Sequence, residues 1–202
     1  RSLVDDDWSG MVAGVFATPE LPSLAISEIM YHPSEELIPF GYGEEDFEFV
    51  EILNHGDQPV LLEGMALSEG VDFIFPSHTL APGDAVVVAA QPAALLVHNQ
   101  TLAGKVLGPY EGRLANGGEM IGLSDVAGRL LDQVQFDDEE AWPESADGQG
   151  SSLERIRFDL ADASAWRASH VVGGSPGKVI VDQTISATIQ WMAANIVRIR
   201  FE

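Results

Sequence analysis

Clustered carboxylates are the side chains of this sequence that come nearest to a chemical site. A metal site here would use Asp137, Asp138, Glu139, Glu140 and Asp147. Calcium takes roughly six to eight oxygen ligands, which carboxylates on one loop supply. The pattern is not an EF-hand, because counting back from Gly148 puts Pro143 at the first ligand position. Three interpretations stay open: a calcium site, a solvated acidic loop, and a carboxylate pair for acid–base catalysis.

The other residue types that commonly carry chemistry form no recognisable set. The chain has no cysteine, which excludes disulfides, thiolate zinc sites and cysteine nucleophiles. Its histidines lack the spacing of a zinc-binding helix, and no serine lies in a G-x-S-x-G elbow. The scattered histidines are His32, His55, His78, His98 and His170. We therefore predict no enzymatic activity and no cofactor other than calcium.

Three aromatic residues bear on carbohydrate binding. Trp142 follows the acidic run, where it either closes one end of an apolar core or offers a stacking surface to a sugar. The two interpretations differ in where the ring points. If Trp142, Tyr110 and Tyr42 lay together on one face, carbohydrate binding would be favoured.

The composition limits the classes of partner. The net charge is −22, from 32 acidic and 10 basic residues, and such a surface repels the phosphate backbone of nucleic acids. It suits solubility in a salty or extracellular setting, or the binding of divalent cations. The hydrophobic content of 46% is enough for a buried core. No apolar stretch reaches the roughly 18 residues that span a membrane.

Short strand patterns follow one another from Leu24 to Ile156. They are separated by turn signals every roughly 8–12 residues, which is typical of an all-β sandwich or barrel. The expected strands are Leu24–Met30, Phe47–Asn54, Val60–Leu62, Met65–Leu67, Phe73–Phe75, Ala85–Ala90, Lys105–Leu107, Met120–Ser124, Leu130–Phe136 and Ser151–Ile156. Pro92–His98 is the expected helix, with proline in its first turn, and Asp162–Arg167 is an expected helical turn.

Alternation within the strands predicts which residues form the core. In Phe47–Asn54, Val50 and Ile52 fall on one face and Glu51 on the other. Glu51 and Glu154 are expected to be partly exposed. The residues expected to be buried between the sheets are Val50, Ile52, Phe75, Val86, Val88, Ile121, Leu123, Val134 and Leu153.

Several short motifs occur in an order that resembles the lamin tail domain. They are ISEIMYHP at Ile26–Pro33, EFVEILN at Glu48–Asn54, FIFP at Phe73–Pro76, LAPGDAVVV at Leu80–Val88, NGGEMIGLSDVAG at Asn116–Gly128, and DGQGSSLER at Asp147–Arg155, followed by GSPG at Gly174–Gly177. Each motif alone is weak, but their order is specific. The resemblance covers roughly Leu24–Gly177 and implies an all-β, immunoglobulin-like β-sandwich of the lamin tail type.

The resemblance also implies a role. Bacterial members of this family are modules of large exported or surface proteins, and the family has no shared active site. An extracellular or cell-surface location is therefore expected, with a protein or cell-surface polymer as partner. We interpret the chain as a non-catalytic interaction or spacer module of a larger exported bacterial protein. The alternative is a carbohydrate-binding or substrate-targeting module attached to a hydrolase.

The two ends are expected to lie outside the sandwich. Residues 1–23 resemble the end of a preceding segment and a linker, residues 24–178 the sandwich, and residues 179–202 a β-hairpin that opens a following β-domain. The chain therefore reads as a piece of a longer protein. One face of Gln183–Glu202 is apolar and must pack on something. Met11–Phe16, or the same hairpin of a second molecule, is expected to cover it. The flanking strands then pair either within one chain or by exchange between two chains, and the second alternative gives a homodimer through the terminal strands.

Overall fold

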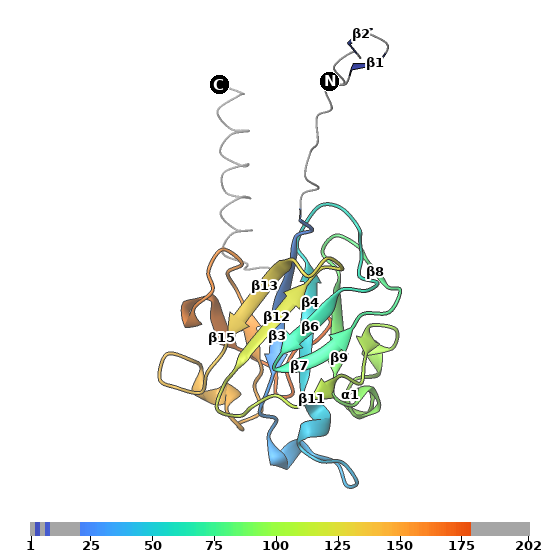
Figure 1. Ribbon diagram of the computed structural model, residues 1–202. Helices are drawn as coiled ribbons and strands as arrows, with labels where there is room; N and C mark the ends of the chain where they lie inside the picture. Colours follow the sequence, from blue (N-terminus) through green and yellow to red (C-terminus); the bar gives the residue numbers. More distant parts are fainter. Residues whose placement is uncertain (1–2, 5–6, 9–20, 179–202) are drawn as a thin grey trace, which may run out of the picture.

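The computed structural model describes residues 3–4, 7–8 and 21–178. In residues 21–178 two β-sheets pack face to face around one core, which confirms the predicted all-β sandwich (Figure 1). The apolar run at 11–16 and the hairpin expected at 183–202 lie outside the described residues. Outside the sandwich, β1 (Leu3–Val4) pairs with β2 (Asp7–Trp8).

The larger sheet has six strands in the order β10-β9-β4-β3-β14-β15. Its neighbours pair antiparallel except β10 and β9, which run parallel. The strands are β3 (Leu24–Met30), β4 (Phe49–Asn54), β9 (Ala85–Ala89), β10 (Val106–Leu107), β14 (Leu153–Arg155) and β15 (Trp166–Ala168).

The smaller sheet has five antiparallel strands in the order β11-β7-β6-β12-β13. Its strands are β6 (Ala66–Glu69), β7 (Val71–Ile74), β11 (Glu111–Gly112), β12 (Met120–Ser124) and β13 (Leu130–Gln135). A separate pair joins β5 (Val60–Leu61) to β8 (Thr79–Leu80).

Helical structure in the described residues is confined to short pieces. The helix α1 (Pro92–His98) has the predicted bounds, with proline at its start. The 3₁₀ turns are η1 (Glu35–Leu37), η2 (Glu45–Phe47), η3 (Gln100–Leu102), η4 (Glu144–Ala146) and η5 (Ala163–Ala165). The helical turn expected at Asp162–Arg167 is therefore η5 followed by the edge strand β15. None of these helices is long and apolar enough to cross a bilayer.

The core between the sheets contains every residue that the alternation placed there. All nine are at most 1% exposed, which confirms the predicted register, since a slip of one residue would have turned them outward. They are Val50, Ile52, Phe75, Val86, Val88, Ile121, Leu123, Val134 and Leu153.

One irregularity in β3 decides which side chains face away from the core. The pairing of β3 with β4 shifts between Ile26 and Glu28, which is a β-bulge at Ser27. Before the bulge Ile26 points into the core; after it Ile29 does. Strict alternation would have put Glu28 on the same face as Ile26. The bulge therefore turns Glu28 to the outer face of the six-stranded sheet.

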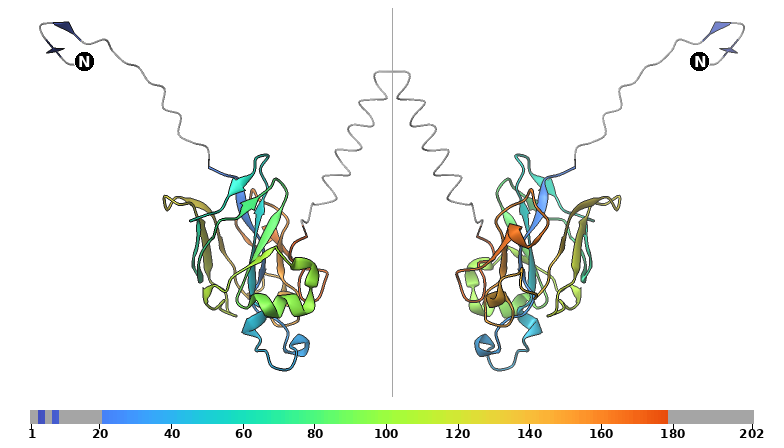
Figure 2. Two further views of the ribbon diagram at one scale, coloured as in Figure 1. Left: turned by 90° about the vertical axis from the view of Figure 1, so that its right-hand side faces the viewer. Right: turned by 90° about the vertical axis from the view of Figure 1, so that its left-hand side faces the viewer.

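That outer face is itself covered. A second apolar cluster packs Phe49, Val87 and Ala89 of the sheet against Ala94 and Leu95 of α1. The rest of the face lies under residues 169–178, here called the closing segment. Figure 2 shows α1 and the orange chain of this region on the side of the six-stranded sheet away from the five-stranded one. The six-stranded sheet is thus buried on both faces along its central strands.

Candidate functional site: a buried carboxylate row beside an apolar groove

Three glutamates lie side by side across the outer face of the six-stranded sheet. Glu28 of β3 pairs in register with Glu51 of β4 on one side and with Glu154 of β14 on the other. Arg167 of β15 continues the row beyond Glu154. Like charges directly opposite each other on neighbouring strands repel. The carboxylate row, Glu51–Glu28–Glu154, therefore needs compensating partners.

The expectation that Glu51 and Glu154 are partly exposed is wrong. Both are 2% exposed and Glu28 is 1% exposed. The alternation assigned them correctly to the face opposite the core, but that face is covered by the closing segment instead of water. Polar side chains this deeply buried require hydrogen-bond partners, since an unpaired buried charge is very costly.

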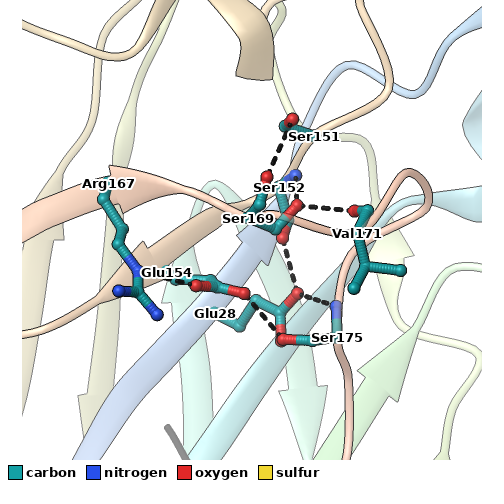
Figure 3. A network of polar contacts seen from close by, with 8 residues as sticks. All are labelled: Glu28, Ser151, Ser152, Glu154, Arg167, Ser169, Val171 and Ser175. Atoms are coloured by element: carbon teal, nitrogen blue, oxygen red, sulfur yellow. Dashed lines mark hydrogen bonds and ion pairs between the residues drawn. The ribbon is translucent and has the colours of Figure 1, made fainter. Parts of the chain in front are cut away.

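The closing segment supplies many of those partners (Figure 3). The Ser175 N–H donates to Glu28 Oε1 at 2.7 Å, and the Ser175 hydroxyl donates to Glu154 Oε1 at 2.7 Å. The Gly177 N–H donates to Glu51 Oε2 at 2.5 Å. The closing segment, which has no regular secondary structure, thereby contacts all three carboxylates of the row.

The remaining partners come from the sheet itself. Glu28 Oε1 accepts a second hydrogen bond from the Ser152 hydroxyl at 2.5 Å, and Glu154 Oε2 accepts one from Arg167 Nε at 3.0 Å. Glu51 Oε1 accepts a hydrogen bond from the Ser27 hydroxyl at 2.7 Å, so the residue at the bulge also donates to a carboxylate of the row.

The surroundings raise the pKa of two of these carboxyls, that of Glu28 more than that of Glu51. Burial, followed by the charge of Glu51, raises the pKa of Glu28 from 4.5 to about 8. Burial also raises the pKa of Glu51 to about 7, although the hydrogen bonds from Ser27 and Gly177 oppose the shift. Desolvation penalises the charged form of a carboxyl, and a neighbouring negative charge adds to the penalty.

A fourth buried carboxylate ties down a loop at the edge of the sheet. Glu48, just before β4, is 1% exposed. Its Oε2 accepts hydrogen bonds from the Tyr110 hydroxyl at 3.0 Å and from the Leu114 N–H at 2.9 Å, while Arg113 Nε lies 3.4 Å from Oε1. Burial raises the pKa of Glu48 to about 7 against the opposing effect of these bonds.

An apolar groove of about 240 Å³ lies beside the carboxylate row. One wall is formed by α1, η2 and η3, and the other by the closing segment from Val171 to Pro176. Met30, Phe47 and Leu95 contribute apolar surface. Its ionisable lining residues are His98 and Lys178, without any carboxylate.

The acidic loop does not assemble as a metal cage. Asp137 Oδ1 accepts a hydrogen bond from the Glu139 N–H at 3.0 Å, and Asp138, Glu139 and Glu140 are exposed. Asp147 instead lies against His32, with Asp147 Oδ1 2.5 Å from His32 Nδ1. Within the described ranges, no three histidine or acidic side chains are grouped to hold a metal ion. Calcium binding at Asp137–Asp147 stays a prediction.

The Asp147–His32 pair has no nucleophile attached to it. The second ring nitrogen of His32, Nε2, lies 3.2 Å from Glu44 Oε1. A catalytic triad would place a hydroxyl or thiol at that nitrogen. Here a histidine between two carboxylates instead joins the loop that contains Glu44 to the loop that contains Asp147.

The three aromatic residues do not form one platform. Tyr110 is buried against Glu48, and Tyr42 packs edge-on against Phe47 in the second apolar cluster. Trp142 packs on the main core, with its ring 6.2 Å from that of Trp166. The interpretation of Trp142 as a lid over one end of the core agrees with this position, and the arrangement that would have favoured sugar binding is not present among these residues.

Comparison with known families agrees with this architecture. The sequence model of the lamin tail domain family matches residues 17–138, which is more than half of the chain. The chain belongs to the lamin tail domain family. This is a family of immunoglobulin-like domains, so membership establishes the immunoglobulin-like fold.

Solved structures include proteins that are similar to this lamin tail domain. The crystal structure of a DUF4876 family protein from Bacteroides thetaiotaomicron is similar, with 13% sequence identity and a TM-score of 0.45. The similarity covers 79% of this chain and 72% of that one. No curated protein sequence matches the chain.

The carboxylate row of this lamin tail domain was not predicted as a site. Glu51 and Glu154 were assigned to the correct face, but their strand positions gave no sign that they would be covered. A signal was nevertheless present, because the motifs ISEIMYHP, EFVEILN and DGQGSSLER each put a glutamate inside an otherwise strand-like run. Glutamate is uncommon in strands, so these three positions were unusual, but they did not indicate what would cover them.

Proposed function

We propose that this lamin tail domain is a non-catalytic interaction or spacer module of a larger exported bacterial protein. Its partner would be a protein or a cell-surface polymer, and its location extracellular or on the cell surface. Family membership supports the module, and the contacts of its ionisable groups support the lack of catalysis.

The observation that carries the proposal is that the buried acidic groups bond within the domain. Glu28, Glu51 and Glu154 are satisfied by the closing segment and the sheet, and Glu48 by the loop at Tyr110. The apolar groove has no carboxylate in its lining to act as a general acid or base. Carboxylates that are bonded inside the domain suit a module that binds a partner through its surface. General acid–base catalysis instead needs a titrating group that faces the substrate.

Turnover assays test the catalytic part of this proposal. The chain and its His32→Ala variant are incubated with panels of ester, phosphate and glycoside substrates. We expect no turnover above a protein-free blank for either protein. Turnover by the wild type that is lost in His32→Ala would contradict the proposal, because the Asp147–His32 pair would then be part of an active site.

The location is tested separately. Antibodies raised against residues 24–178 are used on the cytoplasmic, envelope and culture-medium fractions of the source cells. We expect the signal in the envelope or the medium. A signal confined to the cytoplasm would contradict the exported location and leave the non-catalytic role to the turnover assays.

A further inference from the structure

The hydrogen-bond pattern of the carboxylate row indicates that one of its three carboxyl groups carries a proton. Glu51 accepts at both oxygens, from Ser27 and from Gly177, and Glu154 accepts at both, from Ser175 and Arg167. Both patterns fit an ionised carboxylate, which has acceptors only. Glu28 is different, because its two short hydrogen bonds both reach Oε1.

The second oxygen of Glu28 faces the Ser175 hydroxyl, 3.4 Å away. The hydrogen of that hydroxyl is already directed to Glu154 Oε1 at 2.7 Å. The free lone pair of Ser175 Oγ therefore faces Glu28 Oε2. A proton on Oε2 turns this contact into a donated hydrogen bond, whereas an ionised Oε2 has no donor and faces an oxygen lone pair.

We propose that the carboxylate row is a protonation-dependent latch that holds the closing segment, residues 169–178, on the sheet. The latch is closed while Glu28 carries its proton. Loss of that proton puts three negative charges in register on neighbouring strands, and the closing segment, whose Ser175 and Gly177 hold the row together, is released. Since Val171–Pro176 form one wall of the apolar groove, release also opens the groove.

The charged groups around Glu28 favour release at high pH. Glu51 faces it from β4 and Glu154 from β14. Arg167 of β15 bonds to Glu154, and Lys105 acts on Glu51 from a distance. Arg155 and Lys178 line the small cavity next to Glu28 and Glu51. Arg155 is paired elsewhere, with Asp132, and Lys178 is exposed, so neither compensates fully for a third buried charge.

The pH range of release follows from the raised pKa of Glu28. A carboxyl that titrates at 4.5 when exposed and at about 8 when covered binds a proton in the closed state that it loses on opening. The equilibrium constant for opening then rises about tenfold per pH unit between these values and levels off above the higher one. Between pH 6.5 and 9 this amounts to roughly a thirtyfold rise.

Amide hydrogen exchange of the intact chain measures this opening. Mass spectrometry follows peptides that cover residues 169–178 and, as a reference, the central strand β9 (Ala85–Ala89), from pH 6 to 9, with rates corrected for intrinsic base catalysis. We expect protection of the closing segment to fall at least tenfold between pH 6.5 and 9 and to stay well below that of β9 at every pH, because the segment opens without unfolding of the domain.

Two variants separate the latch from a merely structural contact. Glu28→Gln has the shape and the donor of the protonated carboxyl but cannot ionise, so its closing segment should stay protected up to pH 9. Glu63→Gln removes the same charge at an exposed position outside any candidate site and should behave as the wild type. The latch would be overturned by protection that is constant with pH in the wild type, by an unchanged pH dependence in Glu28→Gln, or by protection of the closing segment equal to that of β9, which would mean that the segment opens only when the whole domain unfolds.

Discussion

The ion pair between Asp132 and Arg155 joins the two sheets, and its removal should be costly. Asp132 lies on β13 of the smaller sheet and Arg155 on β14 of the larger one, with Arg155 Nη1 2.6 Å from Asp132 Oδ2. The same oxygen accepts a hydrogen bond from the Ile26 N–H of β3 at 2.8 Å. The Arg155 side chain is 4% exposed and that of Asp132 is 14% exposed, so little water is available to replace a lost partner.

Asp132→Asn keeps the shape and an acceptor for Ile26 but removes the charge. Arg155 then stays buried with backbone acceptors alone, which are the carbonyls of Leu160 at 2.8 Å, Arg157 at 3.2 Å and Ile26 at 3.4 Å. Leaving one partner of a buried pair uncompensated costs about 3–5 kcal/mol. Because the remaining carbonyls still accept from Arg155, we expect Asp132→Asn to lower the unfolding free energy by about 3 kcal/mol.

The matched control is Asp159→Asn. Asp159 pairs with Arg157 at 2.7 Å, but the two side chains are 66% and 50% exposed, and exposed pairs of this kind contribute little to stability. Urea unfolding at pH 7, followed by the fluorescence of Trp166 that packs on Arg155, gives both values. Equal costs for the two substitutions, or a cost below about 1 kcal/mol for Asp132→Asn, would refute the assignment of a dry inter-sheet pair.

Four further outcomes are expected. Ile52→Ala should cost about 2–5 kcal/mol in urea unfolding and Ile74→Ala under about 1, since the first side chain is 0% and the second 74% exposed; similar costs would mean a wrong register. Burial raises the pKa of Glu28 from 4.5 to about 8, so the stability that its proton contributes is fully present below pH 4.5 and is lost as the pH rises to about 8. Unfolding free energy should therefore fall by up to about 1.4 kcal/mol per pH unit in that window, and less steeply in Glu28→Gln; equal slopes would contradict this. If the loop Asp137–Asp147 takes calcium, millimolar calcium should raise the melting temperature saturably relative to chelator, and an unchanged midpoint would leave the solvated loop. Removal of residues 179–202 should lower the mass measured in solution from dimer to monomer, whereas monomers in both forms would exclude dimerisation through that segment.

The sheets could be predicted from sequence because their signal is local. Apolar alternation in Phe47–Asn54 and the continuous run Ala85–Ala90 identify strands without reference to the rest of the chain. Pro92 likewise marks the start of α1 at the predicted residue. Short strands such as β11 and β15 were missed, because two or three residues carry no measurable period and are strands only through the neighbours that they pair with.

The carboxylate row could not be predicted, because it depends on contacts across long sequence separations. Ser175 lies 147 positions from Glu28 and Gly177 lies 126 positions from Glu51. The bulge at Ser27 adds a second obstacle, since a period of two puts Glu28 into the core. A strand pattern defines two faces; it does not say which of them another part of the chain will cover.

The glycines of the GSPG motif can be explained from the row beneath them. Gly174 has φ of +80°, and a Cβ atom there would lie 2.6 Å from Glu28 Oε1. Gly177 has φ of +76°, and its Cβ would lie 2.8 Å from Leu102 Cδ2. Residues with side chains rarely adopt such backbone angles and never such contacts. The closing segment can therefore come close enough to donate its backbone N–H groups only with glycine at these two positions.

The two residues between these glycines, Ser175 and Pro176, also fit the carboxylate row. Ser175 donates through both its N–H and its hydroxyl, so one residue serves Glu28 and Glu154 together. Pro176 is buried and has no N–H that would need an acceptor there. Each position of the motif thus either supplies a donor to a carboxylate, avoids an unpaired donor, or leaves room for the backbone. The GSPG motif is, in physical terms, the counterpart of three glutamates on strands far away in the chain.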